Sequence, residues 1–307
     1  MDIAFCTDNN YIMPCGITII SLLENNKKEK ITIHLLGLEV TQPNKDLLKG
    51  ICDKYGSTIH FYDVDKKSLN KVEPPIKGAS HINISTFIRL FLPDILPVNV
   101  EKVLYLDCDL LILDDLSELW DTNIDSYSLA GVIDFPTFMP ETYQKLKYPD
   151  NFSYVNAGVL LINLKYWREN DVLNKLLNYT TNNFDNIDRK DQDIINGALY
   201  DSIRLLPIRY NMHNFFFWRN CNAHQYQGQV KEALTKPAII HFTTSMKPWL
   251  KVSVHPMTEI YREYKSLSPW KDVPITWGNL TMKRKIRYYK RVILDSLGLK
   301  KHKFIKM

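Results

Sequence analysis

The sequence predicts an α/β fold built on a mixed, mainly parallel β-sheet with flanking helices. Short apolar runs alternate with single helical patterns over the first 64 residues, which is typical of right-handed βαβ units in a parallel sheet. Polar clusters follow two of the apolar runs, at residues 7–10 and at Asp107 and Asp109. Ligands of open α/β sheets bind at such strand ends. With 307 residues, 45% of them hydrophobic and 24% charged, the chain has an ordinary globular composition.

The first half supplies most of the predicted parallel strands. Residues 2–6 form an apolar run that ends in the polar cluster Thr7-Asp8-Asn9-Asn10. Ile17, Ile20 and Leu23 have helical spacing. Further along, we expect a strand at 31–36, a helix at 43–55, a strand at 58–64 and a strand that ends at Asp107.

The second half is less regular. We expect strands at 130–133, 155–164 and 238–242, a helix from Lys165 to about Asn178, and a helix over roughly 189–199. Pro248 and Trp249 interrupt the pattern after the last of these strands. The chain shows no internal repeat and no low-complexity linker. We therefore predict one catalytic domain over residues 1–279 and a separate tail over residues 280–307.

The tail carries an unusual charge. Residues 280–307 contain ten Lys or Arg against the single acid Asp295, although the whole chain has a net charge of only +5. Apolar residues from Ile286 to Leu297 recur near helical spacing among these basic residues. Such a basic amphipathic helix suits an anionic membrane surface. A helix packed on its own domain and a nucleic-acid patch are the alternatives, and no nucleic-acid-binding module accompanies the tail.

The N-terminus and the cysteines bear on location. Residues 1–6 lack the basic and then apolar stretch of a signal peptide, and no apolar run approaches the roughly 20 residues that span a bilayer. The five cysteines are scattered and lack CxxC spacing, which favours reduced thiols over a disulfide framework or a zinc site. We expect a cytoplasmic protein, peripheral on the inner face of the plasma membrane if the tail binds lipid.

Asp107 and Asp109 are the most informative residues of the chain. They flank Cys108 between two apolar runs. In an extended backbone residues i and i+2 face the same way, so we expect both carboxylates to point to one place. Two such charges repel unless a cation joins them, and a hard divalent metal is a simple solution. A strand end with two solvated acids is the alternative.

Several motifs in order give the chain a family resemblance. The motifs are Phe5-Cys-Thr-Asp8-Asn-Asn10-Tyr11, His81-Ile82-Asn-Ile-Ser85-Thr-Phe-Ile-Arg89, Val103-Leu-Tyr-Leu-Asp107-Cys-Asp109, Asn156-Ala-Gly158, Asp191-Gln192-Asp193, and His241 followed by Lys247-Pro-Trp249. Over residues 1–250 the chain resembles glycosyltransferase family 8, retaining transferases of GT-A fold that include bacterial lipooligosaccharide galactosyltransferases. Any one motif is weak, but their joint order is specific.

The resemblance implies a metal site and a nucleotide-sugar donor. Asp107, Asp109 and His241 would hold a divalent ion, Mn²⁺ or Mg²⁺, against the two phosphates of UDP-galactose or UDP-glucose. Lys247 would add a second positive charge. Many relatives carry glycine where this chain has Thr244, so the contact with the pyrophosphate there would come from the hydroxyl. A histidine at the edge of the core and an ordinary surface lysine are the alternatives for His241 and Lys247.

The resemblance also assigns the rest of the donor and acceptor sites. The residues expected around the donor are Thr7, Asp8, Asn10, Tyr11, Ile82, Arg89, Cys108, Asn156, Ala157, Asp191 and Gln192. Asp191 and Gln192 are the candidate catalytic residues, with Gln192 near the anomeric carbon, and Asp134 would face the acceptor. No carboxylate is an obvious nucleophile, which favours front-side attack. A helix N-cap explains Asp8 equally well, and an acidic helix start explains Asp191.

The sequence thus predicts a metal-dependent retaining hexosyltransferase that acts on a saccharide or glycolipid, such as a lipopolysaccharide precursor. Modification of a protein acceptor is one alternative. A non-catalytic nucleotide-sugar-binding protein is another. The aromatic run Phe215-Phe-Phe-Trp218 is either a sugar platform or buried packing. We expect no nucleic-acid partner, since only the tail would favour one.

Overall fold

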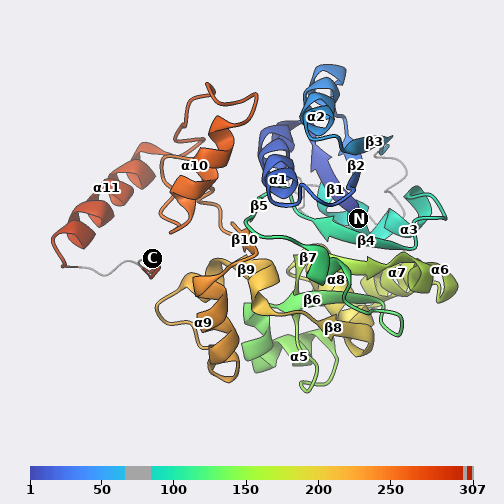
Figure 1. Ribbon diagram of the computed structural model, residues 1–307. Coiled ribbons are helices and arrows are strands. Elements are labelled where there is room, and N and C mark those ends of the chain that lie inside the picture. Colours follow the sequence, from blue (N-terminus) through green and yellow to red (C-terminus); the bar gives the residue numbers. More distant parts are fainter. Residues whose placement is uncertain (66–83, 300–302, 306–307) are drawn as a thin grey trace.

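The computed structural model describes residues 1–65, 84–299 and 303–305. A seven-stranded sheet with the strand order β3-β2-β1-β4-β7-β6-β8 forms its centre (Figure 1). The strands are β1 (Asp2–Asp8), β2 (Thr32–Leu38), β3 (Thr58–Asp63), β4 (Lys102–Leu106), β6 (Leu129–Ile133), β7 (Val155–Asn163) and β8 (Ile203–Leu205). The predicted alternation of strands and helices in the first 64 residues is confirmed.

The central sheet is parallel except around β7. Strands β1 to β4 pair in parallel, as do β6 and β8, whereas β7 runs antiparallel to both of its neighbours, β4 and β6. The carboxyl ends of β1 and β4 therefore lie at the same edge, next to the amino end of β7. This confirms the predicted mixed, mainly parallel sheet, and it places three of the sequence motifs at one edge.

A second, three-stranded sheet lies beside the first. Its order is β5 (Leu110–Ile112), β10 (Ile239–His241) and β9 (Met212–His213). Because β5 follows β4 after a short turn, the chain passes from one sheet to the other at the acid pair. β10 pairs antiparallel to β5, with His241 opposite Leu110. This pairing brings a residue from late in the chain to the acid pair.

The helices cover both faces of the central sheet (Figure 1). They are α1 (Ile12–Asn25), α2 (Gln42–Lys54), α3 (Leu92–Ile95), α4 (Ser117–Trp120), α5 (Pro140–Leu146), α6 (Leu164–Glu169), α7 (Val172–Asn182), α8 (Lys190–Leu199), α9 (Gln227–Thr235), α10 (Thr258–Ser266) and α11 (Met282–Ser296). Alternate residues of a strand face opposite sides. In β1, accordingly, Ile3 and Phe5 pack with α1 and α2, whereas Ala4 and Cys6 pack with the layer of α3 and α6 to α8.

One predicted helix is wrong. The helix expected from Lys165 to about Asn178 is two helices, α6 and α7, which are separated at Asn170 and Asp171. Asp171 has a left-handed backbone, with φ of 50°, and such a residue cannot continue a right-handed helix. Its carboxylate instead accepts hydrogen bonds from the side chain of Asn174, at 2.9 and 3.0 Å.

The C-terminal segment leaves the domain and returns to it. In the described part of the chain, α11 buries none of its side chains, and Figure 1 shows it standing away from the sheets. Residues 303–305 then come back: Ile305 donates a backbone hydrogen bond to Phe217, at 2.9 Å, and Phe304 is only 4% exposed. Among the described residues, none of the helices has the length and apolarity needed to cross a membrane.

Candidate active site

Asp107 and Asp109 lie where the chain crosses between the two sheets. We expected an extended backbone here, and this was wrong: β4 ends at Leu106, the chain turns at Cys108 and Asp109, and β5 begins at Leu110. The turn is fixed on both sides, because Asp107 donates its backbone N–H to Gly158 at 2.8 Å and Asp109 accepts one from Phe242 at 3.0 Å. The two carboxylates nevertheless converge, because the turn brings them to one place, as the alternation of an extended strand would have done.

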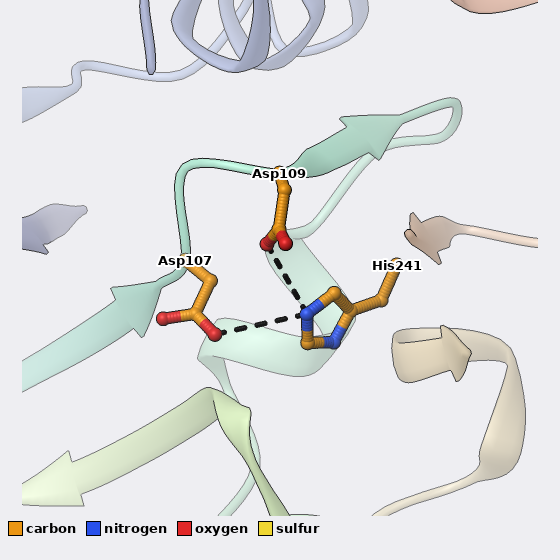
Figure 2. Close-up of side chains that lie close together, drawn as sticks. All are labelled: Asp107, Asp109 and His241. Carbon is orange, nitrogen blue, oxygen red and sulfur yellow. Dashed lines mark ion pairs between the residues drawn. The ribbon is translucent and has the colours of Figure 1, made fainter. Parts of the chain in front are cut away.

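His241, the last residue of β10, completes this cluster (Figure 2). Its Nε2 lies 3.7 Å from Asp107 Oδ2 and 3.2 Å from Asp109 Oδ1. One ligand atom from each of the three residues lies within 4.8 Å of the others. Two carboxylate oxygens and an imidazole nitrogen form a donor set that divalent metals accept. The cluster is therefore compatible with a metal site.

The other oxygen of each carboxylate is held by a cation. Asp107 Oδ1 lies 3.0 Å from Arg89 Nη2 and accepts a hydrogen bond of 2.7 Å from the Tyr105 hydroxyl. Asp109 Oδ2 forms an ion pair with Lys247. Burial alone would raise the pKa of Asp109, but the Lys247 ammonium and the neighbouring His241 ring outweigh it and lower that pKa. One oxygen of each acid is thus left facing His241.

Two residues that the sequence analysis did not assign to the site position His241. Asn211 Oδ1 lies 3.0 Å from His241 Nδ1 and accepts its hydrogen. Gly158 gives the ring room, because a Cβ at this position would lie 2.2 Å from His241 Cε1 and 2.7 Å from Asp107 Oδ2. Gly158 belongs to the motif Asn156-Ala-Gly158, and this motif was the sequence signal that could have assigned it to the site. Asn211 carried no signal beyond a polar residue beside β9.

Arg89 joins the acid pair to Asp191. Its side chain is 5% exposed, its Nη1 donates to the Ala157 carbonyl at 2.6 Å, and its Nε lies 3.1 Å from Asp191 Oδ2. The guanidinium also lies over the Tyr105 ring, 4.4 Å from the centroid. Burial raises the pKa of Asp191 to about 6, although the charge of Arg89 acts to lower it. These contacts place Asp191 beside the acid pair.

Asp134, Asn156 and Gln192 form a second polar group next to the first. Asp134 follows β6, Asn156 lies in β7 and Gln192 in the first turn of α8. Asp134 Oδ2 accepts hydrogen bonds from the side-chain amides of both Asn156 and Gln192, each 2.9 Å long. Burial acts to raise the pKa of Asp134, and the charge of His213 together with these hydrogen bonds lowers it. The expected catalytic and acceptor residues are therefore in direct contact.

The polar cluster after β1 lies at the same sheet edge. Asp8 caps the short helix that follows β1, since its Oδ1 accepts the Asn10 N–H at 2.8 Å. The buried Thr7 donates its hydroxyl to the Asp8 carbonyl at 3.1 Å. The Tyr11 ring packs edge-on against Trp249, with centroids 5.7 Å apart. Burial, and next the charge of Asp109, raise the pKa of Tyr11, which reflects how near this cluster lies to the acid pair.

Two of the expected donor residues contribute less than the others, and a third is not described. Ile82 lies outside the described residues. The thiol of Cys108 is buried and contacts the Cys6 carbonyl at 3.4 Å. Thr244 is half-buried, and its hydroxyl lies at the 3.5 Å limit of a hydrogen bond from Asn214. The Cys108 thiol therefore packs inside the protein, and of these two side chains the Thr244 hydroxyl is the more accessible.

The aromatic run is packed into the core. Phe215, Phe216 and Phe217 are all buried, and the Phe215 ring lies 5.2 Å from that of Phe135, next to Asp134. Trp218 is half-buried and lies 6.1 Å from Phe135. Of the two interpretations of this run, buried packing is correct for the three phenylalanines.

Comparisons with known proteins agree with the geometry of the site. A sequence model of the family described as "Glycosyl transferase family 8" matches residues 2–253. General stress protein A of Bacillus subtilis is 30% identical over 279 residues, which cover 89% of this chain and 96% of that protein. A lipopolysaccharide 1,2-glucosyltransferase of Escherichia coli is 27% identical over 310 residues, with 96% and 88% covered.

The fold is also similar to that of a solved enzyme. The crystal structure of the galactosyltransferase LgtC in complex with donor and acceptor sugar analogs superposes with a TM-score of 0.79 at 28% sequence identity. The match covers 89% of this chain and 99% of that one. This similarity confirms the predicted GT-A fold.

Proposed function

The chain belongs to glycosyl transferase family 8, and we propose that it moves a hexose from a UDP-sugar to the precursor of a cell-surface glycan, with retention at the anomeric carbon. Galactose and glucose are the proposed sugars. Relatives named as lipopolysaccharide glucosyl- and galactosyltransferases support this choice. A lipopolysaccharide precursor is the proposed acceptor class.

The convergence of Asp107, Asp109 and His241 carries the proposal. Each residue keeps one ligand atom directed to the others, while Arg89 and Lys247 hold the outer carboxylate oxygens. This donor set fits Mn²⁺, and Mg²⁺ less well because of the imidazole nitrogen. A divalent ion in this position would stabilise the negative charge that develops on the departing nucleoside diphosphate.

The chain's own residues would do the remaining work. Lys247 places an ammonium group at the acid pair, where it can also contact a phosphate. The side chain of Gln192 is fixed at both ends, since its oxygen accepts the Ala157 N–H at 3.0 Å and its nitrogen donates to Asp134. The second lone pair of that oxygen can stabilise positive charge on the sugar. Thr7, Asp8, Asn10 and Tyr11 would hold the nucleoside.

Asp191 is better suited to holding Arg89 than to attacking the sugar. Its side chain is 8% exposed and is paired with the guanidinium at 3.1 Å, so attack would require the ion pair to break. We therefore propose front-side attack by the acceptor. Incubation with a slow fluorinated UDP-sugar followed by peptide mass spectrometry tests this step. A sugar covalently attached to Asp191 would contradict front-side attack.

A donor screen tests the function as a whole. UDP release from UDP-galactose, UDP-glucose and other UDP-sugars is measured with Mn²⁺ and with chelator. We expect release from a UDP-hexose only when Mn²⁺ is present, and none from Asp109→Asn at an unchanged far-UV spectrum. Asp125→Asn, at an exposed acid outside the site, is the control. UDP-sugar binding without release by the wild type would favour the non-catalytic alternative.

We propose that α11 holds the enzyme on an anionic membrane at the cytoplasmic face. Ile286, Val292 and Ile293 are exposed on this helix among basic residues, and such a helix binds at a lipid interface. Removal of the whole tail would be a poor test, because it also removes the buried Phe304. Charge reversal of three residues of α11 avoids this problem.

Sedimentation with vesicles makes this test. The variant Lys283→Glu, Arg287→Glu, Lys290→Glu and the wild type are mixed with vesicles of phosphatidylcholine alone or with phosphatidylglycerol added. We expect the wild type to sediment only with the anionic vesicles, and the variant with neither. The control reverses the exposed Lys27, Lys28 and Lys30 of the domain and should sediment like the wild type. Equal sedimentation of all three proteins would contradict the proposal.

A further inference from the structure

Asp134 is surrounded by hydrogen-bond donors. Its Oδ1 accepts the Phe135 N–H at 2.6 Å. Nε2 of the buried His213 lies 3.5 Å from the same oxygen, but its hydrogen-bond partner is the Ile133 carbonyl, at 3.1 Å. Asp134 Oδ2 accepts from the side-chain nitrogens of Asn156 and Gln192. With the Phe135 N–H and the two side-chain amides directed at it, Asp134 has little capacity to take a proton from an acceptor sugar. Its environment points to a positioning role instead.

The carboxylate fixes which way the two amides face. A carboxylate only accepts hydrogen bonds, so Asn156 and Gln192 must both turn their NH₂ groups toward Asp134. Backbone donors confirm this orientation independently: the Gly158 N–H binds Asn156 Oδ1 at 2.9 Å, and the Ala157 N–H binds Gln192 Oε1 at 3.0 Å. Neither amide can rotate without placing two donors or two acceptors against each other.

The orientation of Asn156 determines the orientation of Asn211, which in turn determines where His241 carries its hydrogen. Asn156 Oδ1 also accepts from Asn211 Nδ2, at 2.9 Å, so Asn211 must present its oxygen to His241 Nδ1. A carbonyl oxygen only accepts, and Nδ1 must therefore carry the hydrogen. In the neutral ring Nε2 is then left with its lone pair, and this is the nitrogen that faces Asp107 and Asp109. A metal-binding histidine requires this tautomer at Nε2.

We propose that Asp134 is a positioning residue that sets two groups at once: through Asn156 and Asn211 it fixes the tautomer of His241, and directly it fixes the amide of Gln192. One acceptor-only side chain thereby orients the metal-facing nitrogen and the oxygen directed at the sugar. The role needs a carboxylate. An asparagine at position 134 would direct its own NH₂ either at the Phe135 N–H or at the amides of Asn156 and Gln192.

The tautomer of His241 can be measured without metal or substrate. Protein labelled with ¹⁵N at histidine is studied by long-range ¹H–¹⁵N correlation NMR, and His241→Ala identifies the signals. Spectra are recorded over a series of pH values, and we expect the neutral ring of the wild type to be a single tautomer with hydrogen on Nδ1. Asn211→Leu, which removes the acceptor, and Asp134→Asn, which disturbs the relay at its start, should both give a mixture of tautomers. Unchanged His241 nitrogen signals in Asp134→Asn would overturn the proposal.

Asp193→Asn is the matched control for general loosening of the pocket. Asp193 is buried next to Gln192 and accepts hydrogen bonds from the Tyr154 hydroxyl and from the backbone before α8, but it lies outside the relay. We expect this variant to unfold at a lower temperature with the His241 signals of the wild type. Loss of the single tautomer in this control as well would assign the effect to packing and would also overturn the proposal.

The consequence for metal affinity rests on the proposed function. Titration with Mn²⁺, followed by the free-ion EPR signal, should show about 10- to 100-fold weaker binding for Asp134→Asn and Asn211→Leu, the range for residues that orient metal ligands. Asp193→Asn should bind like the wild type. A wild type that binds no Mn²⁺ would refute the metal site, whereas the nitrogen signals would still decide whether the relay exists.

Discussion

Gly158 allows the sharpest test of the candidate metal site. It lies in β7, directly against the cluster, and it has an ordinary strand backbone. Alanine at this position would place its Cβ 2.2 Å from His241 Cε1 and 2.7 Å from Asp107 Oδ2. Carbon atoms in contact prefer about 3.5–4.0 Å, so the imidazole ring must move by about 1 Å or more. The clash falls on two of the three proposed ligands.

The size of the effect follows from this displacement. A shift of about 1 Å in a positioned group lowers an enzymatic rate by roughly 100-fold. Overpacking costs about 1–3 kcal/mol of stability, which leaves most of the free energy of unfolding of a typical domain in place. We therefore expect Gly158→Ala to fold, to bind Mn²⁺ much more weakly, and to release UDP at about one hundredth of the wild-type rate.

The neighbouring strand provides the control. In Gly131→Ala, on β6, the new Cβ would meet Leu160 Cδ2 at 3.1 Å and Val155 at 3.3 Å, which needs shifts of only a few tenths of an ångström. Calorimetric titration with Mn²⁺ and thermal unfolding of both variants separate the effects. If Gly158→Ala kept its Mn²⁺ affinity within threefold of that of Gly131→Ala, the ligand assignment of Asp107 and His241 would be refuted.

Buried charged or titratable groups give three further predictions. Lys247→Met should raise the donor KM roughly 10- to 150-fold, because one charge-assisted hydrogen bond contributes about 1.5–3 kcal/mol. Initial rates measure this, with the exposed Lys251→Met as control. Burial lowers the pKa of His255 from 6.5 to about 3, so the unfolded chain binds more protons between these values, and stability falls as the pH drops below 6.5. Urea unfolding at pH 7 and pH 5 should show that the wild type loses about 2 kcal/mol of its free energy of unfolding through this group, and that His255→Leu does not. Equal losses in the wild type and His255→Leu would contradict the prediction. His224→Gln, which removes an exposed histidine, is the control. Lys265→Met should lower the free energy of unfolding by about 1–3 kcal/mol, because the Lys265 ammonium donates to the carbonyls of Trp270, Lys271 and Val273. The control Lys271→Met should leave the free energy of unfolding unchanged.

The strands and the acid pair could be predicted from local patterns. Buried strands are short apolar runs, and a strand that ends in Asp107 leads a carboxylate to the sheet edge whatever follows. His241 could be assigned only through the family resemblance, because nothing in the sequence near position 241 indicates which strand lies beside it. The pairing of β10 with β5 decides that, and such long-range pairing has no local signal.

The residues that support the site were missed for a physical reason. Asn211 matters because its oxygen meets His241, and Gly158 because it has no side chain where two others converge. Both roles are properties of a contact between distant segments, so neither shows in periodicity or composition. The turn at Cys108 was missed because two acids two residues apart fit an extended strand end as well as a turn. The sequence does not show that the apolar runs on either side belong to different sheets.

The charge balance of the cluster gives an independent argument for the proposed cation. Asp107, Asp109 and Asp191 contribute three negative charges, and the ion-paired Arg89 and Lys247 contribute two positive ones. His241 adds none when hydrogen sits on Nδ1 alone. The cluster then has a net charge of −1. Asp134, in the polar group next to the cluster, makes the local charge more negative. Like charges at such distances repel strongly in a partly buried site, so these residues by themselves would disfavour a diphosphate. A divalent ion reverses the sign of the cluster to +1.

We infer that donor binding depends on the cation, and that Lys247 alone is insufficient. Equal affinity for UDP with Mn²⁺ and with chelator, measured by calorimetry, would show this inference to be wrong.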